Sequence, residues 1–241
     1  MNWYRGPDGE SRIWYEPEEI ERISEDELRR AGLVPTLEDP VTNLEHLIEI
    51  HLNAKLDQYA ALPNDVLGVT HFQSRQRTHI SISKALTESA EELSPRPGVV
   101  GRWRATMAHE ASHVILHRYL FDPVLAGRPL NGSDEHKTGY SRLMRCLHRD
   151  VVHEKAEDWD RTRRVKDWRE VQANMGMAAL LMPQRLFSRI ARQQIDELEL
   201  SDITKGSLSA TSLSSAVANI FRVSKQAASI RLESLAIVSI P

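Results

Sequence analysis

The sequence predicts an α+β fold in which a small sheet is followed by helices. Three short β-rich segments lie next to one another in the chain, Leu56–Leu62, Val66–Phe72 and Thr78–Ile82, and turn-forming residues separate them. Two segments with apolar residues at helical spacing follow, from about Gly101 to Leu120 and over residues 167–183. Strands that are grouped together, rather than alternating with helices, are typical of the α+β class. A small antiparallel or mixed sheet is therefore expected beside long helices.

Length and composition narrow the class of protein. A chain of 241 residues can hold one large domain or two small ones, and 41% hydrophobic with 27% charged residues is ordinary for a globular protein. No apolar run reaches the roughly 18 residues that cross a bilayer. The polar N-terminus lacks the apolar core of a secretion signal, and the single Cys146 excludes an intrachain disulfide. These features predict a cytoplasmic protein without a membrane partner.

The first 39 residues read as an acidic extension. Within it, Pro17–Gly32 has the apolar spacing of an amphipathic helix that packs on the outside of the main domain. Thr42 and Glu45 are then spaced as a capping box, which predicts the start of the next helix. The acidic excess of the first 99 residues is followed by a mild basic bias that is too small to indicate a nucleic-acid partner.

The most informative stretch is His109-Glu110-Ala-Ser-His113, an H-E-x-x-H array on a predicted helix. Residues four apart lie on one helix face, so the two imidazoles can hold one metal ion between them. Glu110 can reach a water on that ion and act as general base, the arrangement of zinc-dependent peptide hydrolysis. Because a pattern this short also arises by chance, a third ligand is the feature that would decide the matter.

The helix over residues 167–183 offers a candidate for that ligand. Asp167 is a plausible N-cap, and Glu170 lies near the helix start with Asn174 one turn later on the same face. A carboxylate here would complete a set of two His and one Glu that leaves a fourth position open, as catalytic zinc sites do. Glu170 is also consistent with an acid that faces solvent near a helix N-terminus. Asn174 can orient a ligand or simply cap or pack.

Other side chains of the region have weaker assignments. His117 continues the histidine row but lies too far along the helix to bind the same ion easily, so a hydrogen-bonded structural role is expected. The polar segment from Asp122 to Lys166 reads as an insertion or lid, with one predicted helix at Tyr140–His148. Cys146 with His148 admits a second metal site, although a lone Cys is more often a small buried residue. Candidates in the insertion for stabilising an oxyanion are His136, Tyr140, His148 and His153.

Residues 184–241 are predicted to be helical. After a helix at Gln184–Glu199, the segments Thr211–Phe221 and Ser224–Leu235 flank a short turn with the spacing of a helix-turn-helix, and Ser224 is a natural N-cap. The side chains of the last helix that we expect to face solvent, where they could contact DNA, are Lys225, Gln226, Ser229 and Arg231. The modest charge of the segment favours instead a helical hairpin that packs on the rest of the chain.

Two stretches together resemble one family. HEASHVILH at His109–His117 is similar to the H-E-x-G-H-x-x-L-H signature of the ImmA/IrrE metallopeptidases, and EVQANMGMAALLMP at Glu170–Pro183 resembles their second signature, E-x-x-A-N-x-F-A-x-x-L-L-M-P. Ser112 replaces the usual Gly and Gly176 stands where Phe is common, so the local packing must differ. The long insertion departs from the family as well.

The resemblance implies a zincin-like domain at residues 40–183, with the extension 1–39 before it and the helical segment 184–241 after it. It implies that His109, His113 and Glu170 hold Zn²⁺, or another divalent metal such as Mn²⁺, with Glu110 as base. Characterised relatives cleave a helix-turn-helix repressor, so we expect a protein substrate, a repressor encoded nearby. Two alternatives remain: a DNA-binding regulator that kept the fold, and an inactive relative whose metal is structural. The sequence leaves the oligomeric state open.

Overall fold

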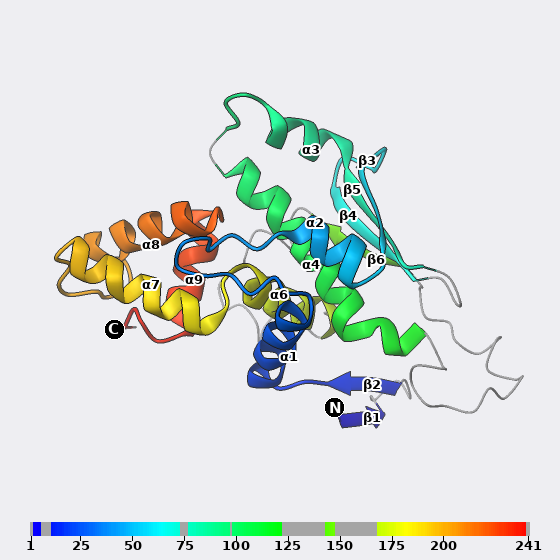
Figure 1. Ribbon diagram of the computed structural model, residues 1–241, viewed down its shortest axis with the longest axis horizontal. Coiled ribbons are helices and arrows are strands. Elements are labelled where there is room, and N and C mark those ends of the chain that lie inside the picture. Colours follow the sequence, from blue (N-terminus) through cyan, green and yellow to red (C-terminus); the bar gives the residue numbers. More distant parts are fainter. Residues whose placement is uncertain are drawn as a thin grey trace, which may run out of the picture.

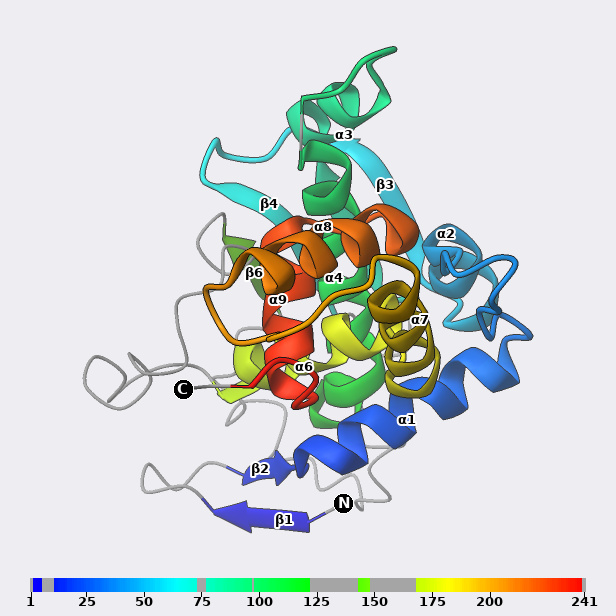
Figure 2. The ribbon, with the colours of Figure 1, turned by 90° about the vertical axis from the view of Figure 1, so that its left-hand side faces the viewer.

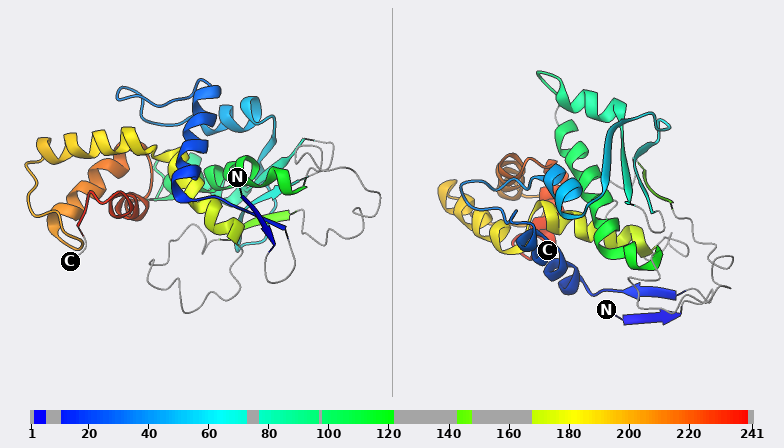
Figure 3. Two further views of the ribbon diagram at one scale, coloured as in Figure 1. Left: turned by 90° about the horizontal axis from the view of Figure 1, so that it is seen from below. Right: turned by 45° about the vertical axis from the view of Figure 1, so that its right-hand side comes forward.

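The computed structural model has the mixed α+β architecture that the sequence predicts (Figure 1). Helix α4 (Val99–Phe121) runs through the middle of the molecule, with the sheet on one side of it and helix α6 (Trp168–Leu181) on another. The C-terminal helices lie at the end of the molecule away from the sheet (Figure 3). The structure describes residues 2–5, 11–72, 77–96, 98–121, 143–147 and 168–239.

The main sheet is mixed and has the strand order β3-β5-β4-β6. Strand β3 pairs parallel with β5, whereas β4 pairs antiparallel with both β5 and β6. Ile80 and Ile82 are buried and alternate with half-buried neighbours, so one face of β5 packs into the core. The three strands expected from the sequence are thereby confirmed. The strand bounds are Lys55–Ala60 for β3, Val66–His71 for β4, His79–Ser83 for β5 and Leu143–Leu147 for β6.

The fourth strand corrects a prediction. Leu143–Leu147 lies inside the segment Tyr140–His148, for which we expected a helix, and it forms β6. It runs antiparallel to β4, with Thr70 opposite Met144. Helix propensity is a weak preference, and the unpaired backbone of an edge strand offers hydrogen bonds that override it. The rest of the predicted insertion, and the proposed N-cap Asp167, lie outside the described residues.

The N-terminal extension is folded onto the main body. Helix α1 (Pro17–Arg30) confirms the predicted amphipathic helix, and it packs against α6 with Ile20 and Leu28 fully buried. Pro17 occupies its first turn, where the missing N–H costs nothing. An antiparallel hairpin of β1 (Asn2–Arg5) and β2 (Ser11–Trp14) precedes α1, and no pattern in the sequence predicted it.

The next helix begins at a different cap from the one predicted. Helix α2 (Leu44–His46) starts after Asn43, whose side-chain oxygen accepts a hydrogen bond from the backbone N–H of His46. Thr42 is buried and donates its hydroxyl to the carbonyl of Leu180 in α6, so the capping box is wrong. The hydroxyl of Thr42 makes this tertiary contact because the chain before α2 lies beside α6 at this point. A π-helical turn η1 (Leu47–His51) continues α2, and helix α3 (Lys84–Glu91) follows β5.

The C-terminal segment is helical as predicted and packs against the start of α4 (Figure 2). Ser224 is the N-cap of the last helix and accepts a hydrogen bond from the N–H of Ala227. A Cβ added at Gly101 would lie 2.6 Å from the backbone nitrogen of Ser224, so the bare backbone of α4 is what lets the turn approach. The helices are α7 (Gln184–Glu197), α8 (Leu208–Phe221) and α9 (Lys225–Ser234).

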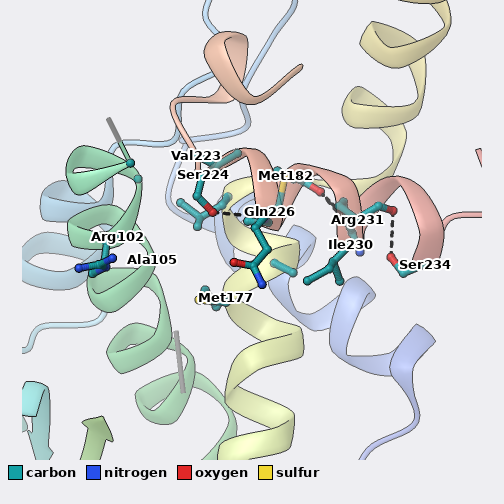
Figure 4. A pocket seen from close by; sticks show the side chains of 15 residues that line it. Arg102, Ala105, Met177, Met182, Val223, Ser224, Gln226, Ile230, Arg231 and Ser234 are labelled. Atoms are coloured by element: carbon teal, nitrogen blue, oxygen red, sulfur yellow. Dashed lines mark hydrogen bonds between the residues drawn. The ribbon is translucent and has the colours of Figure 1, made fainter. Parts of the chain in front are cut away.

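Arg231 does not face solvent as we predicted. It is 5% exposed, and its Nε and Nη2 donate to the carbonyl of Met182 at 3.1 and 2.8 Å (Figure 4). Its guanidinium also pairs with both carboxylate oxygens of Glu21 in α1. The C-terminal end of α6 presents a carbonyl and α1 presents an acid, so the arginine binds inward. This burial favours the packed hairpin over a DNA-reading helix.

One apolar core unites all three predicted parts of the chain. Its buried side chains run from Tyr15 to Val238. Because this core extends across residues 39 and 183, it does not mark a boundary at either position, and the predicted division into three parts stays a prediction. Within the described part of the chain, no helix has the length and apolar character needed to cross a bilayer.

Candidate metal centre

Helices α4 and α6 pack closely together where two small residues, Ser112 and Gly176, face one another. A Cβ added at Gly176 would lie 2.7 Å from Oγ and 2.9 Å from Cβ of Ser112. The Ser112 hydroxyl turns back to donate to the carbonyl of Ala108 at 2.7 Å, which keeps it satisfied in a buried position. Gly176 therefore leaves the space that Ser112 fills. The two departures from the family signature form one packing unit.

The close approach of the helices brings three donor groups together. His109 Nε2 lies 3.0 Å from Glu170 Oε2 and 3.0 Å from His113 Nε2, and His113 Nε2 lies 3.4 Å from Glu170 Oε1. Ligand atoms bound at about 2.0–2.2 Å to a tetrahedral ion are about 3.3–3.6 Å apart, slightly more than the separations in this site. The three side chains therefore fit a small divalent ion. Spacing left the orientation of Glu170 open, and its carboxylate faces the imidazoles.

A hydrogen bond from α6 fixes the ring of His109. Its Nδ1 lies 3.0 Å from Oδ1 of Asn174. Because an amide oxygen can only accept a hydrogen bond, Nδ1–H of His109 donates it. In the neutral ring the lone pair is then on Nε2, which faces the other two candidate metal ligands. Asn174, for which orienting and packing were both open, thus makes the orienting contact.

The charges of the site are coupled. Burial opposes a charged imidazolium at His109, but the hydrogen bond and negative charge of Glu170 more than offset it and raise the pKa of His109 from 6.5 to about 9. Burial likewise opposes ionisation of Glu170, yet His113 and His109 hold the pKa of this carboxyl well below its usual range. Without an ion the folded protein therefore keeps a proton where a cation fits, and a metal must displace it.

Glu110 is fully buried between α4 and β4. Its Oε2 accepts a hydrogen bond from the hydroxyl of Thr70, which also lies 3.3 Å from the Glu110 carbonyl. A Cβ at Gly68 would lie 2.7 Å from Glu110 Oε1, so glycine in β4 makes room for the carboxylate. Sequence reasoning missed Gly68 and Thr70, because no local pattern connects a strand residue with a helix residue 40 positions later.

The structure describes the side chain of only one of the remaining candidate residues, His117. His117 is fully buried and hydrogen-bonded, as expected, and it is not one of the three clustered donors. For Cys146 the structure describes only its backbone, as part of β6. The suggested oxyanion residues lie outside the described residues: His136, Tyr140, His148 and His153.

The fold and the grouping of two imidazoles with a carboxylate are consistent with a metallopeptidase domain. Residues 151–233, about a third of the chain, match the model of the IrrE N-terminal-like domain, and this match supports the resemblance to the ImmA/IrrE family that the two motifs carry. The matched residues include Glu170 and most of the C-terminal helices, and they begin after the H-E-x-x-H helix. No curated protein and no solved structure matches the chain significantly.

Proposed function

We propose that the chain is a metal-dependent endopeptidase that cleaves a helix-turn-helix transcriptional repressor encoded nearby. The peptidase proposal rests on one observation: the ligand atoms of His109, His113 and Glu170 lie together, and the buried Glu110 is next to His109 in the chain. The ImmA/IrrE family supports the class of reaction. The repressor is the expectation that follows from the family resemblance.

The residues divide the work as follows. His109, His113 and Glu170 would hold Zn²⁺ or another divalent ion such as Mn²⁺, which supplies Lewis-acid chemistry that polarises a carbonyl and lowers the pKa of water. Glu110 takes the proton from the attacking water on its carboxylate and passes it to the leaving amine. Thr70 holds that carboxylate in place, and Asn174 holds the ring of His109.

The number of donors favours a catalytic over a structural ion. Structural zinc sites use four protein ligands, whereas catalytic sites use three and leave one position open. Among the described residues the cluster holds three donors. Glu170 also keeps 21% of its side chain exposed, so the cluster borders solvent on that side. Both features support a site that substrate can reach.

The test compares the metal-loaded protein with its Glu110→Gln variant, each incubated with the repressor encoded beside it. We expect the first to cleave the repressor and the variant to leave it intact while binding as much metal. Glu49→Gln makes the same change at an exposed position and should cleave normally. If the loaded protein cleaves a mixed peptide library but leaves the repressor intact, the substrate is wrong. If it cleaves neither, the peptidase is wrong.

A further inference from the structure

A chain of hydrogen bonds leads from α6 to the second candidate ligand. Oε1 of Gln172 lies 3.1 Å from Nε2 of His117, and Nδ1 of His117 lies 3.0 Å from Nδ1 of His113. His113 and His117 are fully buried and Gln172 is 2% exposed. The ring of Trp168 stands edge-on against His117 with the centroids 5.5 Å apart. The His117 ring is therefore held in a fixed place and orientation.

We propose that His117 is a positioning residue that, together with Gln172, fixes the tautomer of His113 and directs its Nε2 lone pair to the metal site. The amide oxygen of Gln172 can only accept, so Nε2 of His117 carries the proton. A neutral ring then accepts at Nδ1, and the donor facing it must be Nδ1–H of His113. The lone pair of His113 is left on Nε2, the atom that lies 3.0 Å from Nε2 of His109.

The same logic acts on the other ligand through a different group. Asn174 accepts from Nδ1–H of His109, so in both histidines Nδ1 carries a proton and Nε2 is directed inward. Helix α6 thus supplies one direct donor, Glu170, and two acceptors that set the rings, Gln172 and Asn174. His117 is needed as the intermediate because Gln172 meets its ring rather than that of His113. This inference rests on the proposed metal site.

The first measurement uses the ion-free protein and needs no activity. Nitrogen-15 NMR of the imidazoles distinguishes the two tautomers of each ring. We expect the proton of His113 on Nδ1 and that of His117 on Nε2. A proton on Nε2 of His113, with Nδ1 bare, would overturn the proposal. This result does not depend on whether the protein proves to be a peptidase.

The second measurement is the dissociation constant for Zn²⁺, obtained by competition with a chelator. Loss of an outer hydrogen-bond partner typically weakens metal binding about 10–100-fold, which we expect for Gln172→Leu and His117→Phe. Gln172→Glu keeps an acceptor and should bind nearly as tightly as the parent protein, a rescue that a merely structural role does not predict. His46→Phe, at an exposed position, is the control.

The outcomes separate the two proposals. Unchanged affinity in a folded Gln172→Leu variant, or equal weakening by Leu and Glu, would show that His117 does not position the ligand. If His117→Phe fails to fold, the comparison of Gln172→Leu with Gln172→Glu and the nitrogen-15 spectrum still test whether His117 positions the ligand. If the parent protein binds no divalent ion, the proposed function fails, whereas the tautomer measurement remains a test of the hydrogen-bond chain itself.

Discussion

The two glutamates of this site have different surroundings, and these surroundings indicate their roles. Glu170 lies against two imidazoles that keep it ionised, which suits a ligand. Glu110 lies against the hydroxyl of Thr70, which can donate to a carboxylate without neutralising it. A carboxylate that must gain and lose a proton during turnover is better served by a neutral partner than by a cation. These surroundings therefore suit Glu170 as a metal ligand and Glu110 as the general base.

Thr70→Val should lower kcat/KM while leaving metal affinity unchanged. The substitution keeps the volume but removes the donor to Glu110, and a hydrogen bond to a buried charged group contributes about 1.5–3 kcal/mol, so a loss of at least tenfold is expected. Thr70→Ser keeps the hydroxyl and should retain most of the activity. Steady-state kinetics with a peptide substrate check the effect. Equal activity of the Val and Ser variants would show that the contact does not hold the base.

The ion-free protein should lose stability as the pH rises from 6.5 to 9. His109 binds its proton more tightly when folded, with a pKa of about 9 against 6.5, so the stabilisation is complete below 6.5 and gone above 9. A shift of this size corresponds to a loss on the order of 3 kcal/mol. Urea unfolding in the presence of a chelator measures it. A flat stability profile between these pH values would contradict the raised pKa.

Metal binding should show the opposite dependence on pH. Because Zn²⁺ must displace the proton of His109, its apparent affinity should rise about tenfold per pH unit up to about 9. Titration calorimetry in buffers of different ionisation enthalpy should report release of about one proton per ion bound near pH 7. Binding without proton release would place the ion elsewhere.

At the scale of elements, the site depends on the contact between α4 and α6. The strand β4 approaches α4 at Gly68, and α6 approaches it at Gly176. Each glycine stands where a side chain would push the partner element away. The helix spacing that places His109 and His113 on one face is of no use unless α6 lies close enough to bring Glu170 to them.

Gly176→Ala should destabilise the protein by about 1–2 kcal/mol, because overpacking of a filled core outweighs the better helix propensity of Ala. The added Cβ would lie 2.7 Å from Ser112 Oγ. In a Ser112→Gly background the same substitution should cost much less, since the obstructing side chain is gone. A double-mutant cycle on the free energy of unfolding measures this coupling. Additive effects would show that the two positions do not share the space.

At the scale of the whole molecule, Arg231 ties together segments that are far apart in sequence. It joins α9 to the C-terminal end of α6 and to Glu21 of α1. Through this contact the N-terminal extension and the C-terminal helices brace the helix that carries Glu170. Arg231 is the only arginine among the four side chains of α9 that could have met DNA, and its burial removes it from such a surface.

Arg231→Met should lower the free energy of unfolding by about 2 kcal/mol, since it leaves the carbonyl of Met182 and the acid of Glu21 without their cation. The figure is below that of a fully buried pair because Glu21 is 19% exposed. Arg192→Met, at an exposed position, is the control and should change little. Chemical denaturation of both variants provides the comparison. Equal stability of the two would show that the contact is incidental.

The sequence by itself determined what depends on local spacing. The i and i+4 histidines define one helix face, alternating Ile80 and Ile82 define a strand face, and Ser224 before a helical run defines a cap. Each of these rests on the geometry of a single element, which a few consecutive residues specify. The predicted strands and the long helices were therefore recovered.

Only the tertiary structure decided which distant groups meet. The carboxylate of Glu170 faces the imidazoles, the hydroxyl of Thr42 binds a carbonyl of α6 instead of capping a helix, and Arg231 is buried. Leu143–Leu147 became a strand because β4 had an edge to pair with. Such choices depend on the packing of elements separated by tens of residues, where burial requires each polar group to find a partner, and no periodicity along the chain records which partner will be there.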